Sequence, residues 1–487
     1  MARIFLTHPY LLKNDAHQSK LKQPYPPLGT LQVAAVLKSS GHEVIWCDPT
    51  FETGLSKLKQ QIRQSGASVL AIVPDDHSVQ IKQCTAPVRQ VMLDLIGFAK
   101  DLKLRTVVSG PDASDNPLVF LNAGSTAVIS GEPVNALSEW LDASGDTQVD
   151  GIWGQSGAQG RRQPEKELDA WPDALWSICD LEPYKTMWKR NHGYWEINVW
   201  TARGCPYRCH WCAKPIWGRS LSMRSPSRVW TEIQYLRRHY SPDRIWFTDD
   251  IFAIKPAWLS KFTALVGNNP IPFRCLSRAD LLKDPSYAHD LAMAGCHTVW
   301  MGAESGSNSV LEAMGKDATV EDATQAVRLL KANQIGSGLF LQLGYPGEHL
   351  RDVIKTIEMV RELNPDEIGV SVSYPLPGTV FYEQVEHALK QLQWSNSMSN
   401  ETLHPAPYQV QFYRYAKSVL RSTHSSKQLK YRTKHFFRSP NLNSARNVLA
   451  SLGHRVHLPF ALRRMKRAAI PNPDAVELSL DSPDLTG

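Results

Sequence analysis

The stretch RGCPYRCHWCAKP, Arg203–Pro215, places three cysteines close together, with three residues between the first two and two residues between the last two. Thiolates are soft ligands that favour zinc, copper(I) and iron–sulfur clusters. A structural zinc site needs four ligands, and this loop offers three thiols with His210 as a strained fourth candidate. An iron–sulfur cube normally takes four cysteines, so three leave one iron without a protein ligand. The spacing therefore indicates a metal site with one open position, which a substrate or a cofactor can occupy.

The composition is that of a globular protein of two or three domains. Of the 487 residues, 42% are hydrophobic and 21% are charged, which excludes disorder as the main state. No apolar run is long enough to cross a bilayer and the first residues do not resemble a signal peptide, so we expect no transmembrane segment and a cytoplasmic location. The eight cysteines are too sparse for a disulfide scaffold. The net charge of +7 is modest for this length and gives no indication of nucleic acid as a partner.

Residues 1–144 alternate short β-rich runs with helical patterns, which predicts an α/β domain with a parallel sheet between helices. Five strands fit a doubly wound, Rossmann-like fold, whose ligands bind beyond the carboxyl ends of the strands. No G-x-G-x-x-G follows the first strand, so a nicotinamide or flavin dinucleotide is disfavoured. Residues 145–190 read as a linker with a hairpin around Gly151–Gly157. The strand candidates are RIFLT, EVIWCD, SVLAIV, RTVVSG and TAVISG.

A second alternating series occupies residues 191–383. Six βα units joined by right-handed crossovers curve toward a barrel, here a partial one of six units. Chemistry in such a fold belongs at the carboxyl ends of the strands, and the cysteine stretch directly follows the first strand. Thr319 and Asp322 form a predicted capping box for the helix that ends before Gly336. The strand candidates are YWEINVWTARG, DRIWFTDD, PFRCLSRAD, HTVWMGAESG, GSGLFLQLGYPGE and EIGVSVSYPLPGT.

Residues 384–470 read as helices without strong motifs, and residues 471–487 as a disordered acidic tail. The helical region is rich in Lys and Arg. These side chains form either a solvated face or a surface that docks an anionic substrate or a membrane, and the sequence leaves both open. Its cations include Arg463, Arg464, Lys466 and Arg467.

The spacing Cys205-x3-Cys209-x2-Cys212 after the first strand of a βα series resembles the signature of radical S-adenosylmethionine enzymes. The doubly wound domain before it is similar to the layout of the cobalamin-binding branch of that superfamily, so the resemblance covers most of the chain. It implies that the three cysteines ligate a [4Fe–4S] cluster and that S-adenosylmethionine chelates the fourth iron. An electron from a donor such as flavodoxin or ferredoxin would then cleave the sulfonium and yield a 5′-deoxyadenosyl radical. Such a radical requires a closed cavity, because it abstracts hydrogen almost indiscriminately.

The resemblance also implies contacts to S-adenosylmethionine at the strand ends. An aromatic ring would pack near the adenine, carboxylates would receive the methionine ammonium, and a guanidinium would pair with the methionine carboxylate. Two further groups would contact the ribose or the methionine moiety, and a glycine-containing turn would let the backbone approach the nucleoside. For each of these residues a purely structural role is the alternative. In that order they are Trp211; Asp249 and Asp250; Arg278; Glu304 and Ser305; and Gly344, Pro346 and Gly347.

The first domain departs from the pattern of cobalamin domains that bind through a histidine. Asp-x-His-x-x-Gly is absent after the first strand, where the chain reads THPYLLKND, and DDHSVQ after the third strand has Gln where Gly belongs. The lower cobalt ligand is therefore open between water, no ligand, His8 and His77. The alternative is a degenerate domain that binds nothing. The nucleotide tail of a bound cobalamin would lie along the strand ends, near Asp75, Asp76, His77, Ser78, Gly110 and Gly131.

The reaction that the resemblance favours is methylation of an unactivated carbon or phosphorus centre, in which the substrate radical takes methyl from methylcobalamin. The runner-up is a radical enzyme that uses cobalamin otherwise, for oxidative cyclisation or ring rearrangement. A cobalamin or metal sensor without turnover is the alternative from another class. A small molecule, a lipid and a peptide all fit as substrate.

Overall fold

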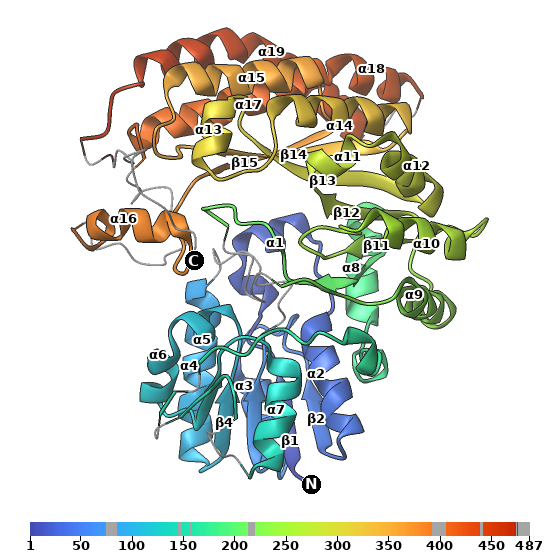
Figure 1. Cartoon of the computed structure of the whole chain (residues 1–487), viewed down its shortest axis with the longest axis vertical. Coiled ribbons are helices and arrows are strands. Elements are labelled where there is room, and N and C mark those ends of the chain that lie inside the picture. The colour runs from blue at the N-terminus through green and yellow to red at the C-terminus, as the bar shows by residue number, and fades with distance from the viewer. Residues whose placement is uncertain are drawn as a thin grey trace. The chain divides into compact units, whose positions relative to one another are not determined.

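The computed structural model shows an α/β protein and describes residues 1–74, 85–144, 149–154, 157–158, 160–212, 220–391, 406–438, 442–473 and 475 (Figure 1). The chain divides into two compact units, and the division falls inside the second series of strands. The predicted domain boundaries at residues 144, 190, 383 and 470 stay predictions. Unit 1 is Met1–Tyr207 with Ala213–Phe273 and Asn396–Met398, and unit 2 is Arg208–Cys212 with Arg274–Ser395 and Ser399–Gly487.

The first sheet of unit 1 has seven strands in the order β2-β1-β3-β4-β5-β6-β7. Strands β1 to β5 are parallel and coincide with the five strand candidates of the sequence. β6 and β7 continue the sheet as antiparallel strands. The order of the first five is that of a doubly wound fold, in which ligands bind where the strand order switches, beside β1 and β3. The bounds are β1 Arg3–Thr7, β2 Glu43–Cys47, β3 Val69–Ile72, β4 Arg105–Val108, β5 Ala127–Ile129, β6 Ile152–Gly154 and β7 Gly157–Ala158.

Helices cover this sheet, and its strands are therefore buried; every residue of β3 is inaccessible to solvent. Leu58 of α3, Leu95 of α4 and Phe120 of α6 join one core cluster with strand residues, whereas α2 packs against α7. The bounds are α1 Ala16–Leu21, α2 Leu28–Ser39, α3 Ser56–Gln64, α4 Thr85–Asp101, α5 Pro111–Asp115, α6 Pro117–Ala123, α7 Pro133–Asp142 and α8 Glu182–His192, with short 3₁₀ turns at Leu12–Asn14, Leu168–Ala170 and Trp176–Ile178.

Unit 1 also holds the first two strands of the second series. β8 (Glu196–Val199) and β11 (Arg244–Phe247) pair in parallel, as the sequence predicts. Helix α9 (Pro226–Tyr240) comes between them, and α10 (Pro256–Val266) follows β11. The sequence did not predict the short antiparallel pair of β9 (Ala202–Arg203) and β10 (Ser222–Met223), which brackets the cysteine stretch along the chain.

Unit 2 contains the later strands of the series. β12 (Phe273–Ser277) begins at the boundary, and β13, β14 and β15 pair in parallel in that order. Helix α14 begins with the predicted capping box, in which Thr319 accepts from the backbone of Asp322 and Asp322 accepts from the backbone of Thr319. The bounds are β13 Cys296–Glu304, β14 Gly336–Leu343, β15 Glu367–Val372, α11 Ala279–Leu282, α12 Pro285–Ala294, α13 Asn308–Ala313, α14 Val320–Ala332 and α15 Leu350–Leu363.

The C-terminal part of unit 2 is helical, as the sequence predicts. α17 packs on α15 and β15, and α19 packs on α17 (Figure 1). α19 continues through Gly453 and Pro459, two residues that disfavour the interior of a helix. A search of the described residues finds no helix long and apolar enough to span a membrane. The bounds are α16 Val380–Gln391, α17 Val410–Lys427, α18 Leu429–Arg438 and α19 Leu442–Arg467.

Candidate functional site

A buried ion pair fixes the chain just before the first cysteine of the stretch. Nη1 of Arg203 lies 2.7 and 2.6 Å from the two carboxylate oxygens of Glu132, and both side chains are 1% exposed. The guanidinium also lies over the rings of Trp171 and Trp200, 5.0 and 4.9 Å from their centroids. Glu132 follows β5 at the ligand edge of the first sheet, so this pair connects that edge to the start of the cysteine stretch two residues before Cys205.

Asp249 holds the end of β8 in place. Its carboxylate accepts hydrogen bonds from Thr201 N at 2.7 Å, Thr201 Oγ1 at 2.6 Å and Ala202 N at 2.8 Å. Burial raises the pKa of Asp249 to about 6, these hydrogen bonds oppose the shift, and the charge of the half-buried Asp250 adds to it. The structure thus gives Asp249 a positioning role at the strand end. Its predicted contact with a methionine ammonium stays a prediction, as does that of Asp250.

The three cysteines of the stretch are half-buried, with Cys205 in unit 1 and Cys209 and Cys212 in unit 2. Within the part of the chain that the structure describes, no three His, Cys, Asp or Glu side chains are gathered as metal ligands. In unit 2, Arg278 Nη1 lies 4.0 Å from Cys209 Sγ. Burial raises the pKa of the Cys209 thiol, whereas the positive charges of Lys316 and Arg278 favour its thiolate. Such cations suit a thiolate that binds a metal.

His210 is engaged elsewhere and does not complete a four-ligand set. The ring Nδ1 of His210 lies 3.1 Å from the carbonyl oxygen of Ala313. Its backbone N–H donates to Met314 O at 2.9 Å, and its backbone carbonyl accepts from Phe381 N at 2.9 Å. The other ring nitrogen packs against Gly315, where a Cβ would lie 2.6 Å from Nε2. The donor set of the stretch is therefore three thiols, which fits a [4Fe–4S] cluster with one open iron better than it fits a closed zinc site.

Arg278, Glu304 and Lys316 form a buried charged group around Cys209. Arg278, which follows β12, donates to Asp280 Oδ1 at 2.8 Å and to the carbonyl of Asp317 at 3.0 Å. Lys316 Nζ lies 3.0 Å from Glu304 Oε1 and 5.5 Å from the ring centroid of Trp211. Sequence reasoning found Arg278, Glu304 and Trp211 but not Lys316, which no motif marks.

The backbone at the end of β13 makes room for this group. Glu304 adopts a φ of +56°, a left-handed conformation that is uncommon for a residue with a side chain and is frequent at functional sites. Gly302 leaves space for the ion pair, because a Cβ there would lie 2.6 Å from Lys316 Nζ. A side chain at Gly302, the first glycine of the GAESG stretch, would thus collide with this ion pair.

Ser305 and the GYPGE turn have internal partners. Ser305 is fully buried, and its Oγ lies 3.3 Å from Thr356 Oγ1 and accepts from Ser307 N at 3.2 Å. The turn is closed by Glu348, whose Oε2 accepts from Gly344 N at 2.5 Å. Burial raises the pKa of Glu348 to about 8. Gly344 and Gly347 have φ of +79° and +82°, which explains glycine at both positions; Gly347 is exposed and Pro346 is buried.

The ligand edge of the first sheet is packed against its own chain at two predicted positions. A Cβ at Gly131 would overlap the backbone of Arg162, and a Cβ at Gly110 would lie 2.8 Å from Pro74 Cγ. Both glycines therefore have structural reasons, and their predicted contacts with cobalamin stay predictions. Asp75, Asp76, His77 and Ser78 lie outside the described residues.

His8, one of the candidates for the lower cobalt ligand, lies in a hydrogen-bonded network with Asp48. Its Nε2 lies 2.9 Å from Asp48 Oδ1, and its Nδ1 accepts from Tyr10 N at 3.3 Å. Asp48 is held further by the hydroxyl of Tyr184 at 2.7 Å. Both ring nitrogens of His8 therefore have partners within a buried network, and the lower cobalt ligand stays open between water, no ligand, His8 and His77.

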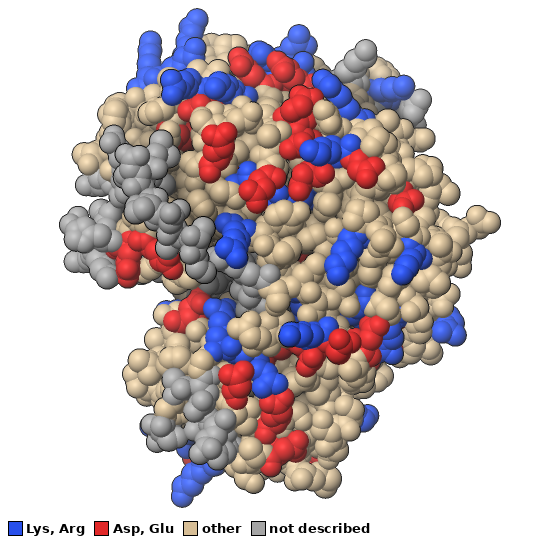
Figure 2. Space-filling model, in the orientation of Figure 1, with Lys and Arg blue, Asp and Glu red and all other residues tan. Residues whose placement is uncertain are grey.

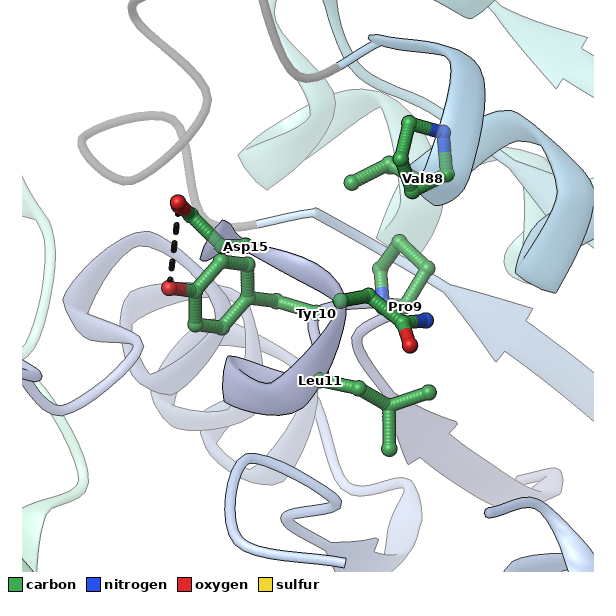
Figure 3. Close-up of a pocket in the computed structure, with 7 residues that line it drawn as sticks. Pro9, Tyr10, Leu11, Asp15 and Val88 are labelled. Atoms are coloured by element: carbon green, nitrogen blue, oxygen red, sulfur yellow. Dashed lines mark hydrogen bonds between the residues drawn. The ribbon is translucent and has the colours of Figure 1, made fainter. Parts of the chain in front are cut away.

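A small pocket opens at the same edge, between the turn after β1 and the first residues of α4 (Figure 3). In Figure 3 the Tyr10 ring points toward Asp15, and its hydroxyl lies 3.3 Å from Asp15 Oδ2. Pro9, Leu11 and Val88 supply an apolar lining. Its position beside the carboxyl end of β1 is where a doubly wound fold places its ligand.

Comparison with known protein families identifies the domain to which the second series of strands and helices belongs. Residues 201–360 match the family model described as Radical SAM superfamily. This region contains the cysteine stretch and the strand ends described above, so the chain carries a radical SAM domain. The prediction of a radical S-adenosylmethionine enzyme is thereby confirmed.

Individual relatives extend the similarity beyond that domain. An uncharacterised methyltransferase of Pyrococcus horikoshii, PH0819, is 25% identical over 375 residues, which cover 74% of this chain and 78% of the relative. The anaerobic magnesium-protoporphyrin IX monomethyl ester cyclase of Synechocystis is 23% identical over 382 residues, 74% of this chain and 73% of the relative.

Solved structures superpose on most of this chain. The cobalamin-dependent S-adenosylmethionine radical enzyme OxsB superposes with a TM-score of 0.69 and 15% identity over 95% of this chain and 72% of its own. The radical S-adenosylmethionine methyltransferase TsrM from Kitasatospora setae, solved with cobalamin and a [4Fe–4S] cluster, gives a TM-score of 0.66 and 19% identity over 80% of this chain and 76% of its own. The chain thus has the fold of cobalamin-dependent radical S-adenosylmethionine enzymes.

Proposed function

We propose that the chain is a cobalamin-dependent radical S-adenosylmethionine methyltransferase that acts on an unactivated carbon or phosphorus centre. The observation that carries the proposal is a donor set of three thiols, with His210 engaged elsewhere, inside a domain that matches the radical SAM superfamily. When bound, the [4Fe–4S] cluster and S-adenosylmethionine supply a radical, and cobalamin supplies a transferable methyl group.

The domain arrangement belongs to the same proposal. A cobalamin-binding Rossmann-like domain over residues 1–144 precedes a partial (β/α)6 barrel over residues 191–383 and a helical region over residues 384–470. The OxsB similarity over 95% of this chain supports this layout. The strand ends around Gly110 and Gly131, at the edge of the sheet that also bears the small pocket near Tyr10, are where the cobalamin would lie.

The side chains have distinct tasks in this proposal. Cys205, Cys209 and Cys212 would hold the cluster. Arg278 and Lys316 would stabilise the thiolate of Cys209 through their positive charge. The remaining predicted residues, Trp211, Asp250, Glu304 and Ser305, and the backbone of the GYPGE turn would orient the nucleoside and its methionine moiety.

A second candidate is a radical enzyme that performs oxidative cyclisation. The similarity to the Synechocystis cyclase over 74% of this chain favours it. Both candidates need a small-molecule, lipid or peptide substrate and an electron donor such as flavodoxin or ferredoxin.

The test is an anaerobic incubation of reconstituted protein with S-adenosylmethionine, a reductant and hydroxocobalamin, read by mass spectrometry. 5′-Deoxyadenosine together with S-adenosylhomocysteine supports methyl transfer, whereas 5′-deoxyadenosine alone supports the cyclase. Formation of neither product overturns both and favours a sensor without turnover. The triple variant Cys205→Ala, Cys209→Ala and Cys212→Ala is expected to lose iron and both products. Cys47→Ala, which removes a half-buried thiol of β2, is the matched control and is expected to keep them.

A further inference from the structure

The C-terminal helices α17, α18 and α19 are rich in basic residues, and their sequence contains no acidic residues that would balance this charge. Residues 406–473 contain fourteen Lys and Arg and no Asp or Glu. Figure 2 shows Lys and Arg side chains standing out along the upper edge of the view, over the region of α19 and α18 in Figure 1. This concentration of charge exceeds the net +7 of the whole chain, so the rest of the protein is net negative.

Among the described residues, one side of α19 packs against the protein and the opposite side exposes apolar side chains. Ser451, Ala461 and Met465 are buried on the side that faces α17. On the opposite side, residues at spacings of three, four and four form one exposed stripe, which we call the α19 stripe. It consists of Leu449, Leu452, Val456 and Phe460, with exposed fractions of 67%, 44%, 70% and 60%.

Arginines and a lysine surround the α19 stripe. At 100° per residue, Arg463 and Arg467 continue the line of the stripe, and Arg446, Arg464 and Lys466 fall beside it. All five side chains are exposed. The neighbouring helix α18 adds two exposed aromatic rings, Tyr431 at 68% and Phe437 at 77%. An apolar stripe with cations along its borders is the pattern of a helix that lies in a membrane interface.

We propose that the α19 stripe and its flanking cations dock the protein onto an anionic lipid surface. The apolar side chains enter the boundary of the acyl chains, and the long basic side chains extend to the headgroups. Each Lys or Arg held near such a surface strengthens binding by a factor of about five. The proposal does not depend on the reaction that the radical SAM domain performs.

Two other occupants fit the surface less well. A second copy of this chain, packed through the same face, would bring together two surfaces of like charge, which repel. A nucleic acid would satisfy the cations, but its phosphates and sugars offer nothing that would bury Leu449, Val456 or Phe460. The combination of apolar stripe and cations therefore favours lipid.

The test is co-sedimentation of the full chain with vesicles, which needs no enzymatic activity. We compare vesicles of phosphatidylcholine alone with vesicles that contain about 30% phosphatidylserine, because the anionic lipid creates the surface potential. We expect binding to the anionic vesicles only, weakened by salt. The variant Val456→Ser/Phe460→Ser is expected to reduce the partition coefficient by about tenfold or more, and Arg463→Gln/Arg464→Gln by about 25-fold.

The matched control places the same change on another exposed apolar residue. Leu118→Ser on α6 removes a side chain that is 61% exposed and is expected to leave vesicle binding unchanged. Unchanged circular dichroism and thermal unfolding of each variant show that the chain still folds. Equal binding to neutral and anionic vesicles, no binding to either, or equal loss in the Leu118→Ser control overturns the proposal. A concentration-dependent dimer or RNA retention that the α19 variants abolish, without vesicle binding, likewise overturns it.

Discussion

Removing one partner of the Glu132–Arg203 ion pair is expected to destabilise unit 1 more than any exposed ion pair does. Both side chains are 1% exposed, so the surviving charge would remain buried without its counter-ion. Breaking a buried pair in this way costs about 3–5 kcal/mol. Glu132 also accepts a hydrogen bond from Val134 N at the start of α7, and the loss of such a cap costs about 1 kcal/mol. We therefore expect Glu132→Ala to lower the free energy of unfolding by about 4–6 kcal/mol.

A double-mutant cycle separates the pairing from the other contacts of the two residues. The double variant Glu132→Ala/Arg203→Met leaves no charge buried, so its cost is expected to fall short of the sum of the single variants by at least about 2 kcal/mol. The matched control is Glu139→Ala, which breaks the pair between Arg162 and Glu139. There the side chains are 20% and 44% exposed, and the expected cost is below about 1 kcal/mol.

Guanidinium denaturation of the apoprotein, followed by tryptophan fluorescence, measures these costs, because Trp171 and Trp200 lie against Arg203. Iron bound per chain after anaerobic reconstitution is the second readout. We expect it to fall for Glu132→Ala, since Arg203 precedes Cys205 by two residues, and to stay unchanged for Glu139→Ala. Equal destabilisation by the two alanine variants, or a strictly additive double variant, would refute the reasoning.

Three further substitutions test local contacts within unit 2. The pKa of Glu348 is raised from 4.5 to about 8, so the folded state binds a proton that the unfolded state has lost, and stability falls as the pH rises through this window. Glu348→Gln is therefore expected to flatten the dependence of the melting temperature on pH, and an unchanged slope between pH 5 and about 8 would contradict the burial argument. Gly315 has a φ of +59°, and Gly315→Ala would place a Cβ 2.6 Å from Nε2 of His210. We expect the free energy of unfolding to fall by at least about 1 kcal/mol and iron to be retained less well. Wild-type values for both would show that His210 is not held there. Thr319→Ala removes one half of the capping box of α14 and is expected to cost about 1 kcal/mol by denaturant titration, with Ser at the same position restoring most of it.

The strands of both series were predictable because parallel strands leave continuous apolar runs and end at glycine or polar residues. The metal site was likewise predictable, because the three cysteines that indicate it lie within a few residues of one another in the sequence. Lys316 and Glu132 were not predictable, because their partners, Glu304 and Arg203, are fixed by the folded chain and no motif links them. Asp249 shows the same limit, since a carboxylate after a strand predicts a polar contact but cannot say that the contact is the backbone of Thr201.

α19 shows how packing overrides local signals. Gly453 and Pro459 both favour the end of a helix, and Pro459 removes one backbone hydrogen bond. The helix continues because Ala461 and Met465 beyond the proline are buried in the contact with α17. A pattern read from one helix alone cannot include the energy of a contact with another helix.

The engagement of His210 bears on how the protein responds to the wrong metal. An imidazole between two thiols offers a strained fourth ligand, and a four-ligand set completed by it would retain zinc in place of iron. Here the ring is tied to Ala313 O and covered by Gly315, so the loop has no fourth donor to offer from that position. Zinc that binds after the cluster is lost to air would then have water as its fourth ligand, and it is expected to be removed by a chelator more readily than zinc in a closed four-ligand site.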